Sequence, residues 1–185
     1  KKVGMKKLFY FIFEIIKMVI LATIIVVPIR YFIFQPFFVQ GQSMEPNFEN
    51  GDYLIVDELS FRFRDPQRGE VVVFKYPKSP SQRYIKRIIG LPGEIIEIKD
   101  GKVIIINEKG NQILNETDYL SPYLLTTGDI QTSLGENEYF VLGDNRVASS
   151  DSRRWGPIKQ QDIIGRVFLR AWPLNALAKI EAPTY

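Results

Sequence analysis

The stretch IIEIKDGKVIII, residues 95–106, indicates most clearly how this chain folds. Two runs of β-branched residues flank Asp100-Gly101, and an Asp-Gly pair between such runs predicts a two-residue β-hairpin turn. Residues 107–137 are polar and weakly patterned, which predicts a loop-rich excursion from a sheet. Short strand-like runs rich in β-branched or aromatic residues occur elsewhere, at 53–56, 70–76, 84–89, 138–142 and 164–172. The chain beyond about residue 30 is therefore predicted to be a mainly β, antiparallel domain.

The N-terminal arm has a different character. Residues 8–34 are almost continuously apolar and exceed the roughly 20 residues that a helix needs to cross a bilayer. Within this arm, Glu14 and Lys17 are spaced to pair on one helix face. Four lysines precede the apolar stretch, which favours a cytoplasmic N-terminus. We therefore expect a single-pass protein of the cell membrane, with residues 1–30 as tail and transmembrane anchor and residues 31–185 as an extracytoplasmic domain.

Two further features of this arm bear on the membrane. No small-residue A-x-A site follows the apolar core, which disfavours a signal peptide that is cut off the chain. The aromatic run at residues 31–38 is typical of an interfacial belt that holds the domain against the lipid bilayer. An ordinary buried strand is the alternative reading of that run, and the two are compatible.

Composition excludes several kinds of chemistry. The 185 residues contain no cysteine and no histidine, so disulfides, thiolate or imidazole metal sites and the Ser-His-Asp arrangement are absent. The net charge of +3 could suggest nucleic-acid binding. However, six basic residues and one acidic residue lie in residues 1–34, which leaves 18 basic and 20 acidic residues for the rest. We therefore expect no nucleic-acid partner, no metal and no cofactor.

Three segments have residues that suggest chemistry and not only a structural role, and they are 41–46, 84–90 and 143–153. The first places Ser43 where a turn can expose its hydroxyl, although a serine that satisfies its own turn is the simpler reading. The second places Lys86 and Arg87 on opposite faces of an apolar strand, unless both lie exposed on an edge strand. Because Arg keeps its proton, only Lys86 can act as a base. In a chain without histidine, a Ser43 nucleophile therefore pairs best with a neutral Lys86, with a hydroxyl such as Ser149 to orient the amine.

At this point the sequence resembles the bacterial type I signal peptidases, the Ser–Lys membrane proteases that remove signal peptides from exported preproteins. The resemblance extends in order over nearly the whole chain, and the segments that carry it are Ser43-Met44-x-Pro46, Gly51-Asp52, YIKRIIGLPGE at 84–94, GDNRVASSDSR at 143–153 and Arg170-Ala171-Trp172-Pro173. It implies a mainly β fold with a smaller inserted β region near residues 95–137. It also implies cleavage after small residues at A-x-A-like sites, close to the secretion translocon.

By the same resemblance, Ser43 is the nucleophile, Lys86 the general base and Ser149 the residue that orients the lysine. The resemblance also supplies two larger sets. Residues that form ion pairs or shape the loop beside the site would be Asp144, Arg146, Asp151 and Arg153. Shallow apolar pockets for small substrate side chains would be built by Val39, Met44, Phe48, Tyr84 and Ile85.

The chain departs from some family members at two places. Gly41 stands where some members have a serine that donates to the oxyanion, so the oxyanion would rest on the Ser43 N–H and another backbone group, with Gly41 as the candidate. Val147 and Ala148 replace polar residues found in some members.

Two other functions compete with this reading. A self-cleaving repressor-type protease shares the Ser–Lys chemistry, but it requires an N-terminal DNA-binding domain where this chain has its apolar arm. A catalytically silent, membrane-tethered β module that binds proteins requires an exposed Lys86 distant from Ser43.

Overall fold

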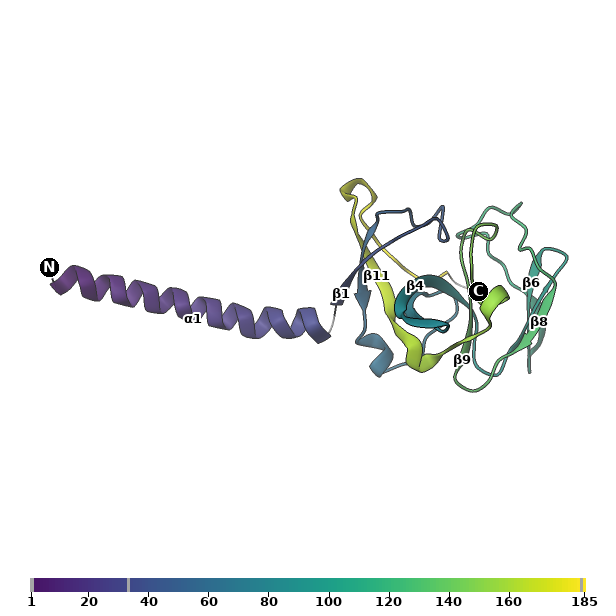
Figure 1. Cartoon of the computed structure of the whole chain (residues 1–185), viewed down its shortest axis with the longest axis horizontal. Coiled ribbons are helices and arrows are strands. Elements are labelled where there is room, and N and C mark those ends of the chain that lie inside the picture. The colour runs from purple at the N-terminus through teal and green to yellow at the C-terminus, as the bar shows by residue number, and fades with distance from the viewer. Residues whose placement is uncertain (1, 33, 184) are drawn as a thin grey trace.

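The computed structural model describes residues 2–32, 34–183 and 185. The helix α1 (Lys2–Phe32) projects away from a body of β-sheet, and β1 (Phe34–Phe38) lies where the helix meets that body (Figure 1). Within α1, the segment Phe9–Val27 has a mean hydropathy of 2.4, and none of it is buried against the rest of the protein. Its length and composition suit a single membrane crossing. Lys17 Nζ lies 2.7 Å from a Glu14 carboxylate oxygen, which confirms the expected pair.

Most of the described strands form one large antiparallel sheet. Its strands lie in the order β1-β2-β11-β3-β4-β9-β10, and β12 pairs with β11. β4 pairs with β3 along much of its length and with β9 only from Arg87 to Gly90, so β9 does not cover the part of β4 before Arg87. The bounds are β2 (Tyr53–Asp57), β3 (Val71–Tyr76), β4 (Ser79–Gly90), β9 (Glu138–Leu142), β10 (Ile158–Lys159), β11 (Ile163–Trp172) and β12 (Ala178–Lys179).

A second, four-stranded sheet follows the order β7-β6-β5-β8, with bounds β5 (Ile95–Lys99), β6 (Lys102–Asn107), β7 (Gly110–Ile113) and β8 (Ile130–Ser133). The expected hairpin joins β5 to β6, and both turn residues have positive φ, 50° at Asp100 and 75° at Gly101, as a type I′ turn requires. The loop-rich excursion expected at 107–137 in fact contains β7 and β8. These two strands are short and largely exposed, so they lack the apolar alternation that marks a strand in sequence.

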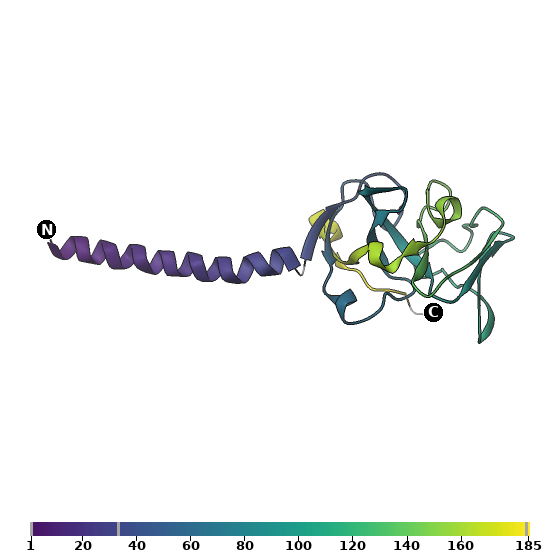
Figure 2. The same ribbon diagram turned by 60° about the horizontal axis from the view of Figure 1, so that its bottom comes forward.

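The two sheets belong to one β body (Figure 2), and their buried side chains form a shared core. Ile89, Phe140 and Leu142 of the large sheet pack with Ile96 and the other buried side chains of the small sheet. Gly90 permits this approach, since a Cβ there would lie 2.6 Å from the Ile96 side chain. Two further core clusters lie on opposite faces of the large sheet, one with Val73 and Ile85 and one with Val72 and Ile88. The predicted mainly β fold class, with an N-terminal apolar helix, is confirmed.

The remaining described helices are short, and they are η1 (Ser60–Arg62), α2 (Ser152–Trp155), η2 (Gln160–Asp162) and η3 (Leu174–Ala176). η3 lies in the connection between β11 and β12, and α2 follows the loop at 143–151. The Asp151 side chain caps α2 by accepting a hydrogen bond from the Arg153 N–H. This cap fixes where the loop ends and the helix begins.

Candidate active site

Ser43 lies in the connection between β1 and β2. Two backbone hydrogen bonds of 2.9 Å close the base of this connection, from Val39 N–H to the Asp52 carbonyl and from Gly51 N–H to the Val39 carbonyl. Met44 and Phe48, each 1% exposed, anchor the loop in the core beneath it. The half-buried Ser43 side chain is thus carried by a loop that is pinned on both sides.

Lys86 extends from β4 to the Ser43 hydroxyl. Its Nζ donates hydrogen bonds to Ser43 Oγ at 2.7 Å and to the Ile85 carbonyl at 2.8 Å. The lysine is only 3% exposed. Burial lowers the pKa of the Lys86 ammonium to about 8, although the carboxylates of Asp151 and Asp144 act in the opposite direction. A neutral amine beside a serine hydroxyl is therefore accessible near neutral pH, and such a pair can activate a nucleophile.

Arg87, the next residue along β4, forms a buried ion pair instead of contacting Ser43. Its guanidinium forms a buried fork with Asp144, at 2.9 Å from Nε and 2.6 Å from Nη2, and donates to the Gly69 carbonyl at 2.9 Å. The Tyr119 ring lies over it, 4.1 Å from the guanidinium carbon to the ring centroid. The alternative that Lys86 and Arg87 both lie exposed is wrong, because both side chains are buried.

The segment 143–153 lies directly against the Ser43 loop. Asn145 donates from its backbone N–H to the Ser43 carbonyl and from Nδ2 to the Gln42 carbonyl, both at 3.1 Å. The approach is close at Gly143, where a Cβ would lie 2.2 Å from Ser149 Oγ and 2.4 Å from the Ser43 carbonyl oxygen. Only glycine can occupy this position without displacing the Ser43 backbone.

Within this segment, Asp151 is fully buried and forms a two-pronged ion pair with Arg153, at 2.8 Å for each contact. Burial works against the charged form of Asp151, but the hydrogen bonds from Arg153 prevail and lower the pKa of the carboxyl group. Ser149 is buried close by, and its hydroxyl helps to lower the pKa of the Asp151 carboxyl group but makes no hydrogen bond to Lys86. The structure therefore brings Ser149 to the site but does not show it holding the lysine.

Arg146 connects this segment to the connection between β7 and β8. It is 1% exposed, donates to the Gly143 carbonyl at 3.1 Å, and contacts the Glu116 carboxylate and the Thr126 hydroxyl. Sequence reasoning missed Glu116, because a single acidic residue in a polar stretch carries no signal of a buried partner 30 positions away.

Two backbone N–H groups near Ser43 differ in their hydrogen bonding. No described residue accepts a hydrogen bond from the Ser43 N–H, which leaves it available to an oxyanion. The Gly41 N–H, expected as the candidate second donor, instead donates to Asn50 Oδ1 at 2.8 Å. Gly41 thus supplies no free donor in this structure, because the Asn50 side chain occupies its N–H.

A groove of about 770 Å³ opens at the Ser–Lys pair and runs to β1. Of the five residues expected to form substrate pockets, Tyr84 and Ile85 line it. Tyr84 stacks on Tyr76, with ring centroids 4.5 Å apart, and Lys86 Nζ lies 5.6 Å from the Tyr84 ring. Val39, Met44 and Phe48 do not line the groove, because their side chains point into the core behind it. Pro36, Phe37 and Phe38 of β1 lie along the groove instead.

Comparison with known proteins gives consistent matches. Residues 12–172 match the family model described as "Signal peptidase, peptidase S26". The chain is 36% identical over 166 residues to a "Probable signal peptidase I-2" of Synechocystis, covering 87% of this chain and 73% of that protein. It is also 36% identical to a "Signal peptidase I" of Leptolyngbya laminosa, covering 92% and 84%. A crystal structure of a signal peptidase I from Enterococcus faecalis shares 34% identity and a TM-score of 0.47, covering 56% of this chain and 97% of that one.

Proposed function

The chain belongs to the signal peptidase family, peptidase S26, and we propose that Ser43 and Lys86 are its nucleophile and general base. As a signal peptidase I it is a serine endopeptidase, and its substrates are preproteins. The observation that carries the proposal is the 2.7 Å hydrogen bond between Lys86 Nζ and Ser43 Oγ, made by a lysine that is 3% exposed. A catalytically silent binding module would require the opposite geometry, an exposed lysine far from the serine.

In the proposed first step, the neutral Lys86 amine takes the proton of the Ser43 hydroxyl as Oγ attacks the scissile carbonyl carbon. The Ser43 N–H stabilises the oxyanion that forms. When the intermediate collapses, the Lys86 ammonium returns the proton to the leaving amine, and the signal peptide remains attached to Ser43 as an ester.

In the second step, Lys86 takes a proton from a water molecule, and the resulting hydroxide attacks the ester carbonyl. Collapse of this intermediate breaks the bond to Oγ, and the proton on Lys86 passes to Ser43. The signal peptide leaves with a free carboxylate. The Arg87–Asp144 ion pair ties the segment 143–153 to β4, and the Asp151–Arg153 pair fixes the shape of that segment beside the site.

We further propose the division and orientation of the chain. Residues 1–30 would form the cytoplasmic tail and single-pass anchor, and residues 31–185 the extracytoplasmic catalytic domain, with residues 95–137 as its smaller region. The lysines before the apolar stretch favour this orientation. Cleavage after small residues at A-x-A-like sites suits the shallow groove at the Ser–Lys pair, and an outward-facing site at the bilayer lies where exported chains leave the translocon.

The direct test is cleavage of a preprotein with an A-x-A site by the full chain in detergent. Ser43→Ala and Lys86→Met should each lower the cleavage rate by at least about 100-fold while the fold is retained, since each removes an essential catalytic group. Ser133→Ala and Lys102→Met serve as matched controls, because both replace exposed residues of the small sheet. Substantial cleavage by either site variant would refute the assignment.

A further inference from the structure

The groove at the active site has an uneven charge. Among the described residues that line it, Lys86 and Arg83 are charged and none is acidic. Lys86 is buried at the catalytic end, whereas Arg83 is exposed on β4. A substrate that enters the groove therefore meets an accessible guanidinium without an acidic neighbour along the wall.

The Arg83 guanidinium has few polar contacts with the rest of the protein. Among the described residues, Arg83 donates a long hydrogen bond of 3.4 Å from Nη1 to Gln35 Oε1 and forms no ion pair. The charge of Arg83 also acts on Glu58, where burial raises the pKa of the carboxyl group against the opposing fields of Arg83 and Arg62. A surface arginine with its fork uncommitted can bind a carboxylate bidentately.

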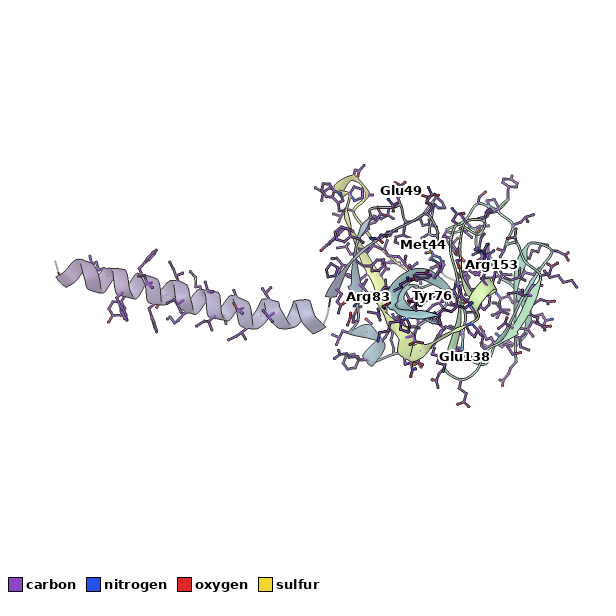
Figure 3. The ribbon with its side chains drawn as sticks, viewed as in Figure 1. Met44, Glu49, Tyr76, Arg83, Glu138 and Arg153 are labelled. Carbon is purple, nitrogen blue, oxygen red and sulfur yellow. The ribbon has the colours of Figure 1, made fainter. Side chains whose placement is uncertain are left out.

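The position of Arg83 identifies the part of the substrate that it meets. Figure 3 shows Arg83 on the side of the β body nearest to the end of α1, which faces the membrane if α1 is the proposed anchor. In a signal peptide, the apolar segment precedes the cleavage site, so the residues before the scissile bond arrive from that side. Arg83 lies three residues from Lys86 along β4, a distance of about 10 Å at roughly 3.3 Å per residue.

We propose that Arg83 is a specificity-determining residue that favours substrates with a carboxylate side chain about four or five residues before the scissile bond and disfavours those with a cationic side chain there. This inference rests on the proposed function and adds a charge preference to it. The preference concerns the segment between the apolar part of the signal peptide and the small residues of the cleavage site. It follows from the exposure and uncommitted charge of Arg83 in the groove.

The test uses the full chain in neutral detergent with three peptides that differ only at the probed position, where they carry Glu, Gln or Lys. For the unaltered protein, kcat/KM for the Glu peptide should exceed that for the Gln peptide by about five-fold, the ratio for one partly exposed ion pair. The Lys peptide should be cleaved more slowly than the Gln peptide. High salt should bring both ratios close to unity.

Variants of Arg83 and of Lys75 then show which of the two cations causes the charge preference. Arg83→Gln should bring the ratios close to unity, and Arg83→Glu should reverse them. Lys75 is the matched control, because it lies directly opposite Arg83 on β3, is exposed and carries the same charge, but does not line the groove. Lys75→Gln should retain the ratios.

Equal cleavage of the three peptides by the unaltered protein would overturn the inference. So would an equal loss of preference in Lys75→Gln and Arg83→Gln. A third contrary result is an effect of Arg83 that appears only on vesicles of anionic lipid and does not depend on the charge of the peptide. The last result would assign Arg83 to the bilayer instead. Failure to cleave any peptide would refute the proposed function, so the two failures are distinguishable.

Discussion

The Lys86 ammonium donates a 2.7 Å hydrogen bond to the Ser43 hydroxyl across a separation of 43 residues in the chain. The bond joins an interior strand of the large sheet to the loop between β1 and β2. In this bond the lysine is the donor, whereas the proposed mechanism needs its neutral amine as an acceptor. The pKa of about 8 determines how often that acceptor form is present.

The first prediction concerns the pH dependence of activity. Because only neutral Lys86 can take the Ser43 proton, kcat/KM should rise with pH and reach half of its plateau near the pKa of about 8. The measurement is peptide cleavage between about pH 6 and about pH 10, a range that spans that pKa. A half-point near the pKa of an ordinary exposed lysine would contradict a desolvated base.

The second prediction concerns stability. The pKa of Lys86 is lowered in the folded state, so between about 8 and the ordinary 10.5 the unfolded chain binds more protons, and stability should rise with pH. Lys86→Met removes this dependence. At neutral pH the variant should be more stable than the unaltered protein by at most about 3 kcal/mol, because it no longer buries a charged ammonium. Thermal unfolding of both proteins should show the advantage of the variant shrinking as pH rises. An advantage that grows with pH would contradict the shift.

The third prediction concerns the buried pair of Arg87 and Asp144. Asp144→Asn leaves a buried guanidinium without its charge partner and should cost about 3–5 kcal/mol. Asp129→Asn is the control, since Asp129 is exposed, and it should change stability by less than about 0.5 kcal/mol. The double variant Arg87→Met/Asp144→Leu should recover much of the loss; equal losses in the single and double variants would show that the pair is not the cause.

The fourth prediction concerns Gly143. An alanine Cβ would lie 2.4 Å from the Ser43 carbonyl oxygen, so Gly143→Ala must displace the nucleophile loop. We expect a loss of cleavage of about 100-fold, as a misplacement of roughly 1 Å can cause. Gly135→Ala is the control, because the nearest atom to its Cβ is a Glu138 carboxylate oxygen at 3.4 Å. Full activity of Gly143→Ala would show that the loop tolerates the shift.

The fifth prediction tests the orientation in the membrane. Because the chain has no cysteine, Lys7→Cys and Tyr123→Cys each create a unique thiol at an exposed position, and Tyr123 is 91% exposed. In intact cells, a membrane-impermeant thiol reagent should label Tyr123→Cys and leave Lys7→Cys unlabelled. The reverse pattern would refute the proposed orientation, and labelling of both after lysis is the control for reactivity.

The sequence could predict those features that depend on local pattern. The 95–106 hairpin follows from β-branched runs around Asp-Gly. The placement of Lys86 and Arg87 on opposite faces of β4 follows from strand alternation. The strands β7 and β8 escaped prediction because they are held by pairing with the hairpin edges, and their own residues are largely exposed.

The site was predictable only in part, for a similar reason. The absence of histidine and cysteine pointed to a lysine as the base of a serine protease, and the structure brings Lys86 to Ser43. The partners of other groups depend on contacts distant in sequence, such as Glu116 with Arg146 and Asp144 with Arg87. No spacing rule indicates such contacts, because tertiary packing alone decides them.

The contact of Glu116 with Arg146 has a consequence for how the protein unfolds. Local opening of the 114–129 connection would leave the Arg146 guanidinium without its carboxylate while still enclosed by the segment that faces Ser43. Opening of that connection and loosening of the active site should therefore form one cooperative unit. Amide hydrogen exchange in the small sheet and heat inactivation would then share a single transition.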